Sequence, residues 1–284
     1  MKFKKVIAAF AAAASLLTFA GCGENNAPTE TEANNAGAAD VTTAEKEEAA
    51  DIGTTTKGKL TIGAEIGYPP FEYFDTDGVT PIGVDVELGK ALGEKLGVEV
   101  EFINTGWDGI FAGLDKGDYD CIISAVTITP ERTVNYDFST PYIQNFQCLI
   151  SLKASDYKPA SPADVAGKRI GYQEETTSDF YITDYADKNG ITFEPFEYAK
   201  IIDAYSDLEN GRLDAIICDS TVAQSYLGEG TIYEQTWIQG ADETPEEFGV
   251  CIKKGNTKLQ ESINKALAEL KESGELDKIL ARYF

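Results

Sequence analysis

The sequence predicts an α/β protein whose folded part is divided into two similar lobes. Short apolar runs that suit strands buried on both faces alternate along the chain with amphipathic stretches that suit helices. One such unit, LDKGDYDCIISA at residues 114–125, recurs as LENGRLDAIICD at residues 208–219. Both copies fit L-x-x-G-x-x-D-[AC]-I-I, so the same helix, turn and buried strand are expected twice. The repeat favours two lobes over one long sheet.

Composition and charge restrict the function. The chain has 24 Lys and Arg residues against 48 Asp and Glu residues, and its net charge of −24 would repel a phosphate backbone. It has no histidine, so a Ser-His triad, a His-ligated metal site and a His acid–base pair are excluded. We therefore expect a globular protein that binds no nucleic acid and carries neither a metal nor another cofactor.

The first 56 residues are predicted to lie outside the fold. Residues 1–22 combine a basic start with an apolar run that is too short to span a bilayer comfortably, which is typical of an export signal. Residues 23–56 contain almost no large apolar residue, so we expect a disordered tether.

The first predicted strand ends next to candidate ligand contacts. Residues 59–64 alternate as a strand, Glu65 follows it directly, and Tyr68 lies in the Pro-rich loop beyond. In open α/β sheets, ligands gather outside the carboxyl ends of the strands. Glu65 and Tyr68 are therefore candidates for ligand contacts.

A helix and a second strand follow. Residues 85–96 predict an amphipathic helix with Asp85 as its N-cap and Gly97 at its end. Residues 98–102 alternate as a strand, and Trp107 stands where the next helix opens. Trp107 could be a core aromatic, but its place at a helix start also suits a ligand wall.

The first copy of the repeat leads into a predicted carboxylate receptor. Its buried strand ends near Ser124, and Thr129 and Pro130 then form an N-cap followed by a proline at the first helical position. The free N–H groups and positive dipole end of that helix favour an anion. Arg132 offers a planar fork that matches a carboxylate, and the hydroxyl of Thr127 can donate to the same group.

The second copy ends on an acid, Asp219. One lobe thus offers a cation and the other an anion, so together they could hold a zwitterion. Asp219 could instead cap the following helix, and Arg132 alone could be a surface ion-pair partner. Their matched positions at strand ends favour a ligand site.

The rest of the second lobe supplies another helix start and a return crossing. Residues 173–180 lead into a helix that Thr177 or Ser178 can cap, where free N–H groups make a second candidate carboxylate contact. Near residues 237–247 the chain is expected to cross back to the first lobe, which the amphipathic helix 257–270 completes. Two crossings make a hinge that can close around a ligand.

Four cysteines follow Cys22, and each lies in an apolar, strand-like run: Cys121, Cys148, Cys218 and Cys251. Buried cysteines usually behave as small hydrophobic residues. Because an exported protein permits disulfides, a bond between Cys148 and Cys251 stays open at this point.

These motifs together resemble the extracytoplasmic solute-binding proteins of family 3, the polar amino-acid-binding proteins of ABC importers. The resemblance covers nearly all of residues 57–284 and rests on GYPPFEY, GVDVELGKAL, GWDGIFAGL, GDYDCIISAVTITPER, FSTPY, GYQEETTSD and GRLDAIICD, in the family's order. It implies a type II, periplasmic-binding-protein-like Venus flytrap with a hinge of two crossings. Lobe 1 would comprise residues 57–148 and 245–284, and lobe 2 residues 149–244.

The resemblance also implies roles for individual residues. The implied ligand contacts are Arg132, Thr127 and Thr177 for the carboxylate, Asp219 and Ser124 for the ammonium group, and Tyr68 and Trp107 around the side chain. Two positions depart from the commoner family pattern, Ala125 in place of a hydroxyl residue and Glu175 in place of glycine. Glu65 and Glu175 could make the pocket acidic and favour a cationic side chain, or they could be solvated carboxylates.

The segment FAGC at residues 19–22 resembles the lipobox of bacterial lipoproteins, with Phe19 in place of the usual Leu. This resemblance implies lipidation of Cys22, which would anchor the protein outside the cytoplasm on the outer face of the bacterial cell membrane or in the periplasm. Ordinary secretion is the alternative.

We therefore expect a monomer that binds a free polar or cationic L-amino acid between its lobes and delivers it to an ABC importer permease, without catalysis. One alternative is an enzyme of the same fold, similar to cyclohexadienyl dehydratase, with Glu175 as the candidate acid. Another is a ligand-sensing lipoprotein, which would require a signalling segment.

Overall fold

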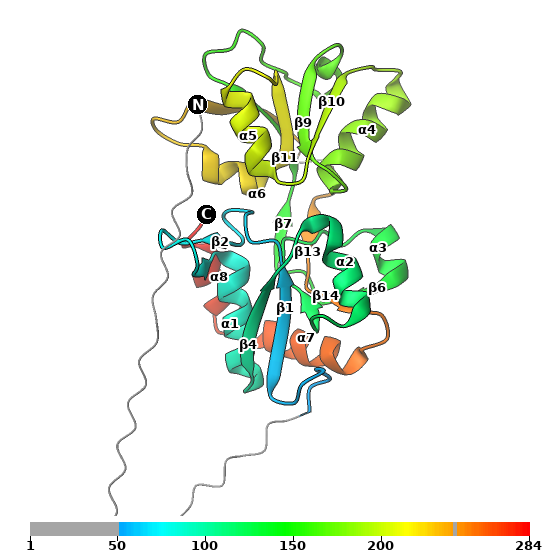
Figure 1. The fold of residues 1–284 in the computed structure, drawn as a ribbon, viewed down its shortest axis with the longest axis vertical. Helices are drawn as coiled ribbons and strands as arrows, with labels where there is room; N and C mark the ends of the chain where they lie inside the picture. The colour runs from blue at the N-terminus through cyan, green and yellow to red at the C-terminus, as the bar shows by residue number, and fades with distance from the viewer. Residues whose placement is uncertain (1–50, 241–242) are drawn as a thin grey trace, which may run out of the picture. The chain divides into compact units, whose positions relative to one another are not determined.

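The computed structural model describes residues 51–240 and 243–284, which form two α/β lobes (Figure 1). The first sheet has the strand order β4-β1-β5-β14-β6, and the second has the order β10-β9-β11-β8-β12. In each sheet, the fourth strand in this order runs antiparallel to both of its neighbours, and the other four strands are parallel to one another. The lobes therefore share one topology, as the sequence repeat predicts. The expected export signal and Cys22 lie outside the described residues, as does the expected tether up to residue 50.

The chain crosses between the sheets at a pair of short strands. The first sheet contains β1 Lys59–Ala64, β4 Glu99–Asn104, β5 Cys121–Ile122, β6 Tyr136–Phe138 and β14 Cys251–Lys253. The second contains β8 Gln147–Leu152, β9 Arg169–Gln173, β10 Glu194–Tyr198, β11 Ala215–Asp219 and β12 Tyr233–Ile238. Two further pairs are β2 Tyr73–Phe74 with β3 Pro81–Ile82, and β7 Ile143–Asn145 with β13 Glu246–Phe248. Because β7 leads into β8 and β13 leads into β14, this last pair forms the hinge. The expected boundary between residues 148 and 149 falls within β8.

Helices cover both faces of the first sheet. Helices α1 (Val84–Leu96) and α7 (Thr257–Glu272) share one apolar core with Ile62 of β1. Helix α2 (Trp107–Lys116) packs on the opposite face, in a separate core. Helix α8 (Glu275–Leu280) packs against α1 and α7. Burial on both faces explains why the strands carry continuous apolar runs.

The second sheet is covered in the same way. Helix α5 (Ile201–Glu209) and α6 (Ser220–Ala223) lie on the face that Ile216 of β11 reaches, and α4 (Thr177–Asn189) lies on the face of Ile217. Two short 3₁₀ turns complete this lobe, η1 Pro162–Val165 and η2 Gln224–Tyr226. None of the helices in the described residues is long and apolar enough to cross a membrane.

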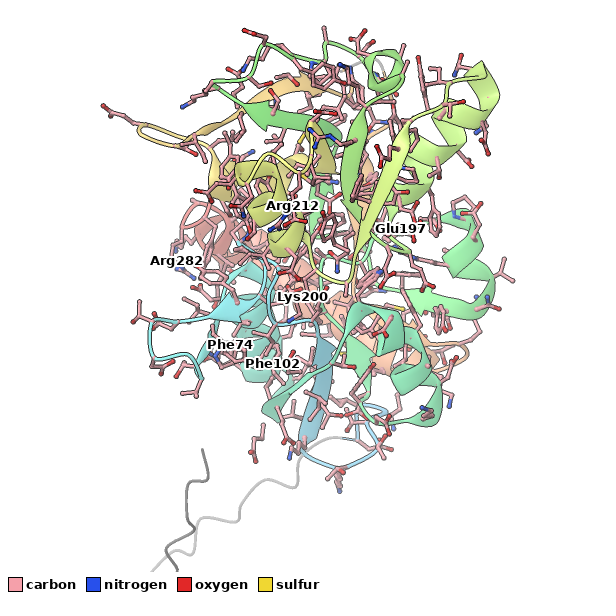
Figure 2. The ribbon with its side chains drawn as sticks, turned by 45° about the horizontal axis from the view of Figure 1, so that its top comes forward. Phe74, Phe102, Glu197, Lys200, Arg212 and Arg282 are labelled. Carbon is pink, nitrogen blue, oxygen red and sulfur yellow. The ribbon has the colours of Figure 1, made fainter. Side chains whose placement is uncertain are left out.

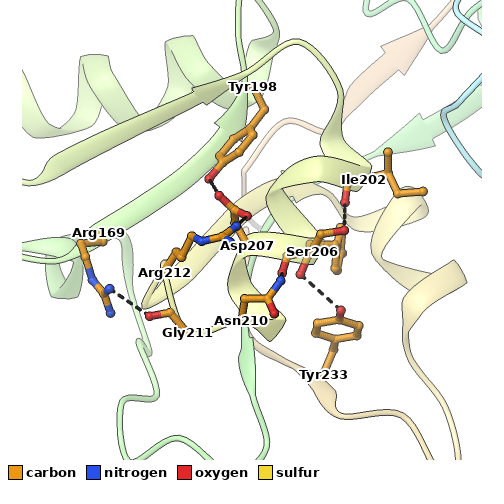
Figure 3. Close-up of polar contacts among 10 residues, drawn as sticks. Arg169, Tyr198, Ile202, Ser206, Asp207, Asn210, Gly211, Arg212 and Tyr233 are labelled. Atoms are coloured by element: carbon orange, nitrogen blue, oxygen red, sulfur yellow. Dashed lines mark hydrogen bonds and ion pairs between the residues drawn. The ribbon is translucent and has the colours of Figure 1, made fainter. Parts of the chain in front are cut away.

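The aspartate of the sequence repeat has the same structural role in both lobes. Asp120 Oδ2 accepts the backbone N–H of Thr61 at 2.9 Å, and Asp214 Oδ2 accepts that of Arg169, also at 2.9 Å. Each bond ties the start of a central strand to its parallel neighbour. In the second lobe, Arg169 also donates to the carbonyl oxygen of Gly211 in the repeat turn at 2.9 Å (Figure 3).

Helix starts follow the expected chemistry in one case and differ in two. Thr129 caps α3 (Pro130–Asn135) by accepting from the backbone N–H of Arg132 at 3.2 Å, so this prediction is confirmed. The prediction that Asp85 caps α1 is wrong, because Gly83 occupies that position and the Asp85 carboxylate is buried in other hydrogen bonds. Helix α4 is capped by Thr176, one residue before the expected caps.

The cysteines of the described residues are free and buried. Cys148 lies in β8 of the second sheet, whereas Cys251 lies in β14 of the first. The bond between Cys148 and Cys251 that the sequence left open is therefore not formed in this structure, and both act as small core residues, in separate cores.

Substitution of Gly83 by Ala should destabilise the fold by about 3 kcal/mol. Gly83 has φ 127°, and a Cβ there would lie 2.1 Å from the carbonyl oxygen of Phe71. Urea unfolding measures the loss. Gly117→Ala is the matched control, because Gly117 also has positive φ (84°) but nothing lies within 4 Å of its added Cβ, so it should cost only about 1–2 kcal/mol. Equal losses would contradict the steric argument.

Candidate functional site

A cavity of about 310 Å³, including its mouth, lies between the lobes. Its lining residues are Glu65, Tyr68, Trp107, Ser124, Ala125, Thr127 and Arg132 from the first lobe, and Gln173, Thr176, Thr177 and Asp219 from the second. All the ligand contacts expected from the sequence, except Glu175, thus line one cavity; their individual roles stay predictions. No group of three or more His, Cys, Asp or Glu within the described ranges is arranged to hold a metal ion.

The cavity is built from the carboxyl ends of parallel strands. Glu65 follows β1, Trp107 opens the helix after β4, and Ser124 follows β5. In the second lobe, Gln173 ends β9 and Asp219 ends β11. Side chains from separate strands therefore meet at one edge of each sheet, where open α/β sheets bind ligands.

Arg132 presents its guanidinium group to the cavity without an ionic partner. It makes no ion pair with any carboxylate in the described part of the chain. Its Nη1 donates to the carbonyl oxygen of Thr127 at 2.9 Å, and its Cζ lies 5.4 Å from the ring centroid of Trp107 and 5.3 Å from that of Phe111. These contacts orient the group by cation–π attraction. Burial lowers the pKa of Arg132, but an arginine stays charged in proteins.

Asp219 presents a buried carboxylate from the second lobe, with 5% of its surface exposed. It accepts hydrogen bonds from the Tyr68 hydroxyl at 2.5 Å, from Asn145 Nδ2 at 2.6 Å and from Gln147 Nε2 at 2.9 Å. Burial raises the pKa of Asp219, and these three donors oppose that shift. The carboxylate at the N-cap of α6 makes no capping bond, so the alternative role as a helix cap is wrong.

Direct contacts join the lobes around the cavity. The hydroxyl of Tyr68 donates to Asp219, and Nε2 of Gln173 donates to Glu65 at 2.7 Å. The hydroxyl oxygens of Thr127 and Thr177 lie 3.3 Å apart. A ligand held here therefore touches polar groups of both lobes.

Glu65 is a buried acid in this cavity, with 3% of its surface exposed. Its burial raises its pKa to about 7, while the hydrogen bond from Gln173 and the charge of Lys200 act in the opposite direction. Lys200 stands at the junction of the lobes (Figure 2). A Cβ added to Gly67 of the first lobe would lie 3.3 Å from Lys200 Nζ. Within residues 51–240 and 243–284, Glu65 thus has no direct ion pair, but it lies in the field of Lys200.

Glu175 does not contribute its side chain to the cavity. The residue is exposed and adopts a left-handed conformation, with φ 59°. Its backbone N–H donates to Asp179 at 3.0 Å, and its carbonyl oxygen accepts the indole N–H of Trp107 at 3.2 Å. This turn before α4 directs the main chain, not the carboxylate, toward the first lobe.

Three polar residues at the hinge were not found from the sequence. Asn145 Nδ2 and Gln147 Nε2 each donate both to Asp219 and to Glu246 Oε2, with both bonds to Glu246 at 3.0 Å. Glu246 also accepts from the Thr177 hydroxyl at 3.3 Å. The hinge amides thereby hold two carboxylates next to the cavity. In the sequence, Asn145 and Gln147 stand out only as polar residues beside an apolar run, which does not indicate a role.

Two similar α/β lobes with a shared cavity between them define a bilobal ligand-binding protein. Residues 60–284 match the bacterial extracellular solute-binding proteins, family 3, and the chain belongs to that family. Membership agrees with the resemblance carried by the sequence motifs, and the expected type II fold is confirmed.

Several named proteins are similar to this chain. It is 32% identical over 225 residues to a probable histidine-binding protein of Neisseria gonorrhoeae, covering 78% of this chain and 82% of that protein. It is 32% identical over 238 residues to ABC transporter arginine-binding protein 1 of Escherichia coli K12, covering 82% and 93%. A solved ancestral arginine-binding protein bound to arginine is 35% identical, with a TM-score of 0.74, covering 80% of this chain and 99% of that one.

Substitution of Glu246 by Gln should stabilise the protein at about pH 8 by about 2 kcal/mol and change little near pH 4.5. Burial and the charge of Asp219 raise the pKa of Glu246 from 4.5 to about 7. The folded state therefore holds more protons than the unfolded state in this window, so wild-type stability falls as pH rises from 4.5 to 7.

Urea unfolding at the two pH values checks this effect. Glu94→Gln, at an exposed position, is the control and should change stability equally at both. A gain from Glu246→Gln that does not depend on pH would show that repacking, not removal of the titrating group, is responsible.

Proposed function

We propose that this protein binds a free cationic L-amino acid between its lobes and delivers it to the permease of an ABC importer. The observation that carries the proposal is the pairing of Arg132 with Asp219. These unlike charges come from separate lobes and line one cavity, and Arg132 has no ionic partner in the described residues. An amino acid carries the complementary charges one carbon apart.

The carboxylate of the ligand would bind at Arg132. A guanidinium group can donate two parallel hydrogen bonds to a carboxylate, and only one Nη1 bond of Arg132 is used, to the carbonyl oxygen of Thr127. The hydroxyls of Thr127 and Thr177 point at each other across the lobes and can turn to the ligand. The first turn of α4, which begins at Thr177, adds free N–H groups.

The ammonium group would bind at Asp219, with Ser124 as a second acceptor. The Tyr68 hydroxyl that donates to Asp219 comes from the opposite lobe. It can release this hydrogen bond, so that the ligand ammonium group donates to the same carboxylate oxygen. Asn145 and Gln147 keep their bonds and hold the carboxylate in place.

The side chain of the ligand would extend toward Glu65, between Tyr68 and Trp107. A buried carboxylate without a direct ion pair favours a cation over a neutral group. The relatives named for arginine and histidine binding support a basic side chain. Glu175 has no part in this pocket.

Capture would work by closure around the hinge strands β7 and β13. A ligand shifts the open and closed populations only through its different affinity for the two forms. Because the proposed contacts come from both lobes, the closed form gains most of the binding energy. The hinge amides link this movement directly to Asp219.

We further propose that the protein acts without catalysis, as a monomer, and is lipid-anchored through Cys22 on the outer face of the cell membrane. The relatives are binding proteins, which supports the absence of turnover.

The FAGC segment supports the lipid anchor at Cys22. Release of a Cys22→Ser variant from the membrane fraction would support lipidation, whereas equal retention of both forms would contradict it.

A panel of free amino acids should raise the melting temperature only when both charged groups are intact. L-arginine and L-lysine are expected to give the largest shifts, and Arg132→Ala or Asp219→Asn should weaken binding at least about 100-fold. Calorimetry measures the affinities. Arg212→Ala removes an exposed arginine paired with Asp207 and is the matched control.

Two outcomes would contradict the proposal. One is the absence of any shift with any amino acid. The other is turnover of a prephenate-type acid by the purified protein, which would favour the dehydratase alternative. If neutral amino acids bind as tightly as basic ones, the receptor function stands and the cationic preference is wrong.

As pH increases toward 7, the affinity for L-arginine should rise about tenfold per pH unit, and above pH 7 it should level off. The ionised form of Glu65 attracts the cation, and its pKa in the protein is raised to about 7. Calorimetric titrations between pH 5.5 and 8.5 measure the profile. Glu65→Gln should lower the affinity and flatten the curve, and L-glutamine, a neutral ligand of similar shape, should give a flat curve with either protein.

A further inference from the structure

Two carboxyl groups are fully buried behind the wall of the cavity. Glu72 lies in the loop after β1, and Asp85 lies in the first turn of α1; both are 0% exposed. The two side chains are within hydrogen-bonding reach of each other. Neither forms an ion pair with a lysine or arginine in residues 51–240 and 243–284. The proposed ligand contacts do not require such a costly arrangement.

Each carboxyl group has one oxygen with a donor and one without. Glu72 Oε1 accepts from the Ser124 hydroxyl at 2.6 Å. Asp85 Oδ2 accepts from the backbone N–H of Ala125 at 2.7 Å and from the Tyr142 hydroxyl at 3.0 Å. The remaining atoms, Glu72 Oε2 and Asp85 Oδ1, are buried and have no donor. Two ionised carboxylates in contact, with such orphaned oxygens, would be strongly destabilising.

We infer that Glu72 and Asp85 share one proton, and that this hydrogen-bonded pair positions Ser124 and Ala125 at the ligand site. A proton between the orphaned oxygens provides the missing donor and removes one of the two charges. Aspartic-acid dyads in other proteins hold one proton for the same reason. The groups that face the pair are Glu65, Tyr142 and the Ser124 hydroxyl, none of which is cationic.

The pair explains two features of the cavity wall. Ala125 has φ 46°, which costs a residue with a Cβ about 1–2 kcal/mol, and its N–H is held there by Asp85. Ser124 gives its only hydrogen to Glu72 and accepts the backbone N–H of Glu65 at 3.1 Å. One lone pair of its oxygen remains, so Ser124 is fixed as an acceptor. Its use for a ligand ammonium group rests on the proposed function.

The protonation of the pair has a defined effect on stability. Burial, then the charge of Asp85, raises the pKa of Glu72 well above its ordinary value. The folded state therefore binds a proton that the unfolded state has lost, so this contribution to stability declines as pH rises toward the folded-state pKa. A side-chain amide in place of one carboxyl group supplies the same hydrogen without titrating.

A double-mutant cycle tests the shared hydrogen without any ligand. Glu72→Gln and Asp85→Asn each leave one donor between the two groups, so each should melt within about 3 °C of wild type at pH 6. The double variant sets two amide N–H groups against each other, and its loss should exceed the sum of the single losses. The melting temperature of Glu72→Gln relative to wild type should also rise between pH 6 and 9.

The exposed residues Glu94 and Asp156 provide the matched cycle, Glu94→Gln with Asp156→Asn, which should be additive and independent of pH. Additive losses at Glu72 and Asp85 would overturn the inference, because a water or ion between the groups would tolerate both amides. Severe unfolding of either single variant would overturn it as well.

Ligand affinity gives an independent readout of positioning. The single variants should bind the preferred amino acid within about threefold of wild type, whereas a folded double variant should bind at least about tenfold more weakly. Unchanged affinity in the double variant would overturn the positioning role. If no amino acid binds even the wild type, the proposed function fails while the stability cycle still decides whether the proton is shared.

Discussion

The proposed ligand site depends on two unlike charges, those of Arg132 and Asp219, that line one cavity without pairing. Asp219 is buried and Arg132 is half-buried in the cavity that both residues line, so their attraction is stronger than in water. They do not pair directly, because Arg132 is held against aromatic rings and Asp219 is held by three donors. A zwitterion can bridge the gap that these supports maintain. In the proposed mechanism, each lobe therefore contributes one half of a site that is complete only when the lobes close.

The strand order places both hinge crossings next to strands that carry proposed site residues. Strand β7 continues into β8, which pairs with β11 and so lies beside Asp219. Strand β13 continues into β14, which pairs with β5 and so lies beside the segment of Ser124. Each crossing strand enters the opposite sheet next to the strand that carries a proposed ammonium contact. A rotation at the hinge therefore changes the separation of these contacts directly.

Much of this site could be predicted because a buried strand and its end can be recognised in the sequence, as an apolar run followed by polar residues. The repeat L-x-x-G-x-x-D-[AC]-I-I identified β5 and β11, and the polar residues beyond them line the cavity. The hinge network could not be predicted, because Asn145 and Gln147 resemble solvated residues of a strand until the opposite crossing brings Glu246 to them. For Glu175 the sequence left a pocket acid and a solvated carboxylate open. The structure favours the second, because the backbone is left-handed at this residue and the side chain is exposed, and the residue type alone does not reveal φ.

The balance of charge supports the proposed preference for a basic ligand more firmly than any single contact does. Arg132 lies in the field of Asp219 and Glu246, and Glu65 lies in the field of Lys200, so these three acids outnumber the two cations near them. The backbone charges of an amino acid cancel and leave this excess unchanged. Protonation of Glu65 can relieve it, and burial favours that protonation by raising the pKa of Glu65 to about 7. A guanidinium or ammonium side chain relieves it without a proton, so ligand and proton compete for the same negative charge.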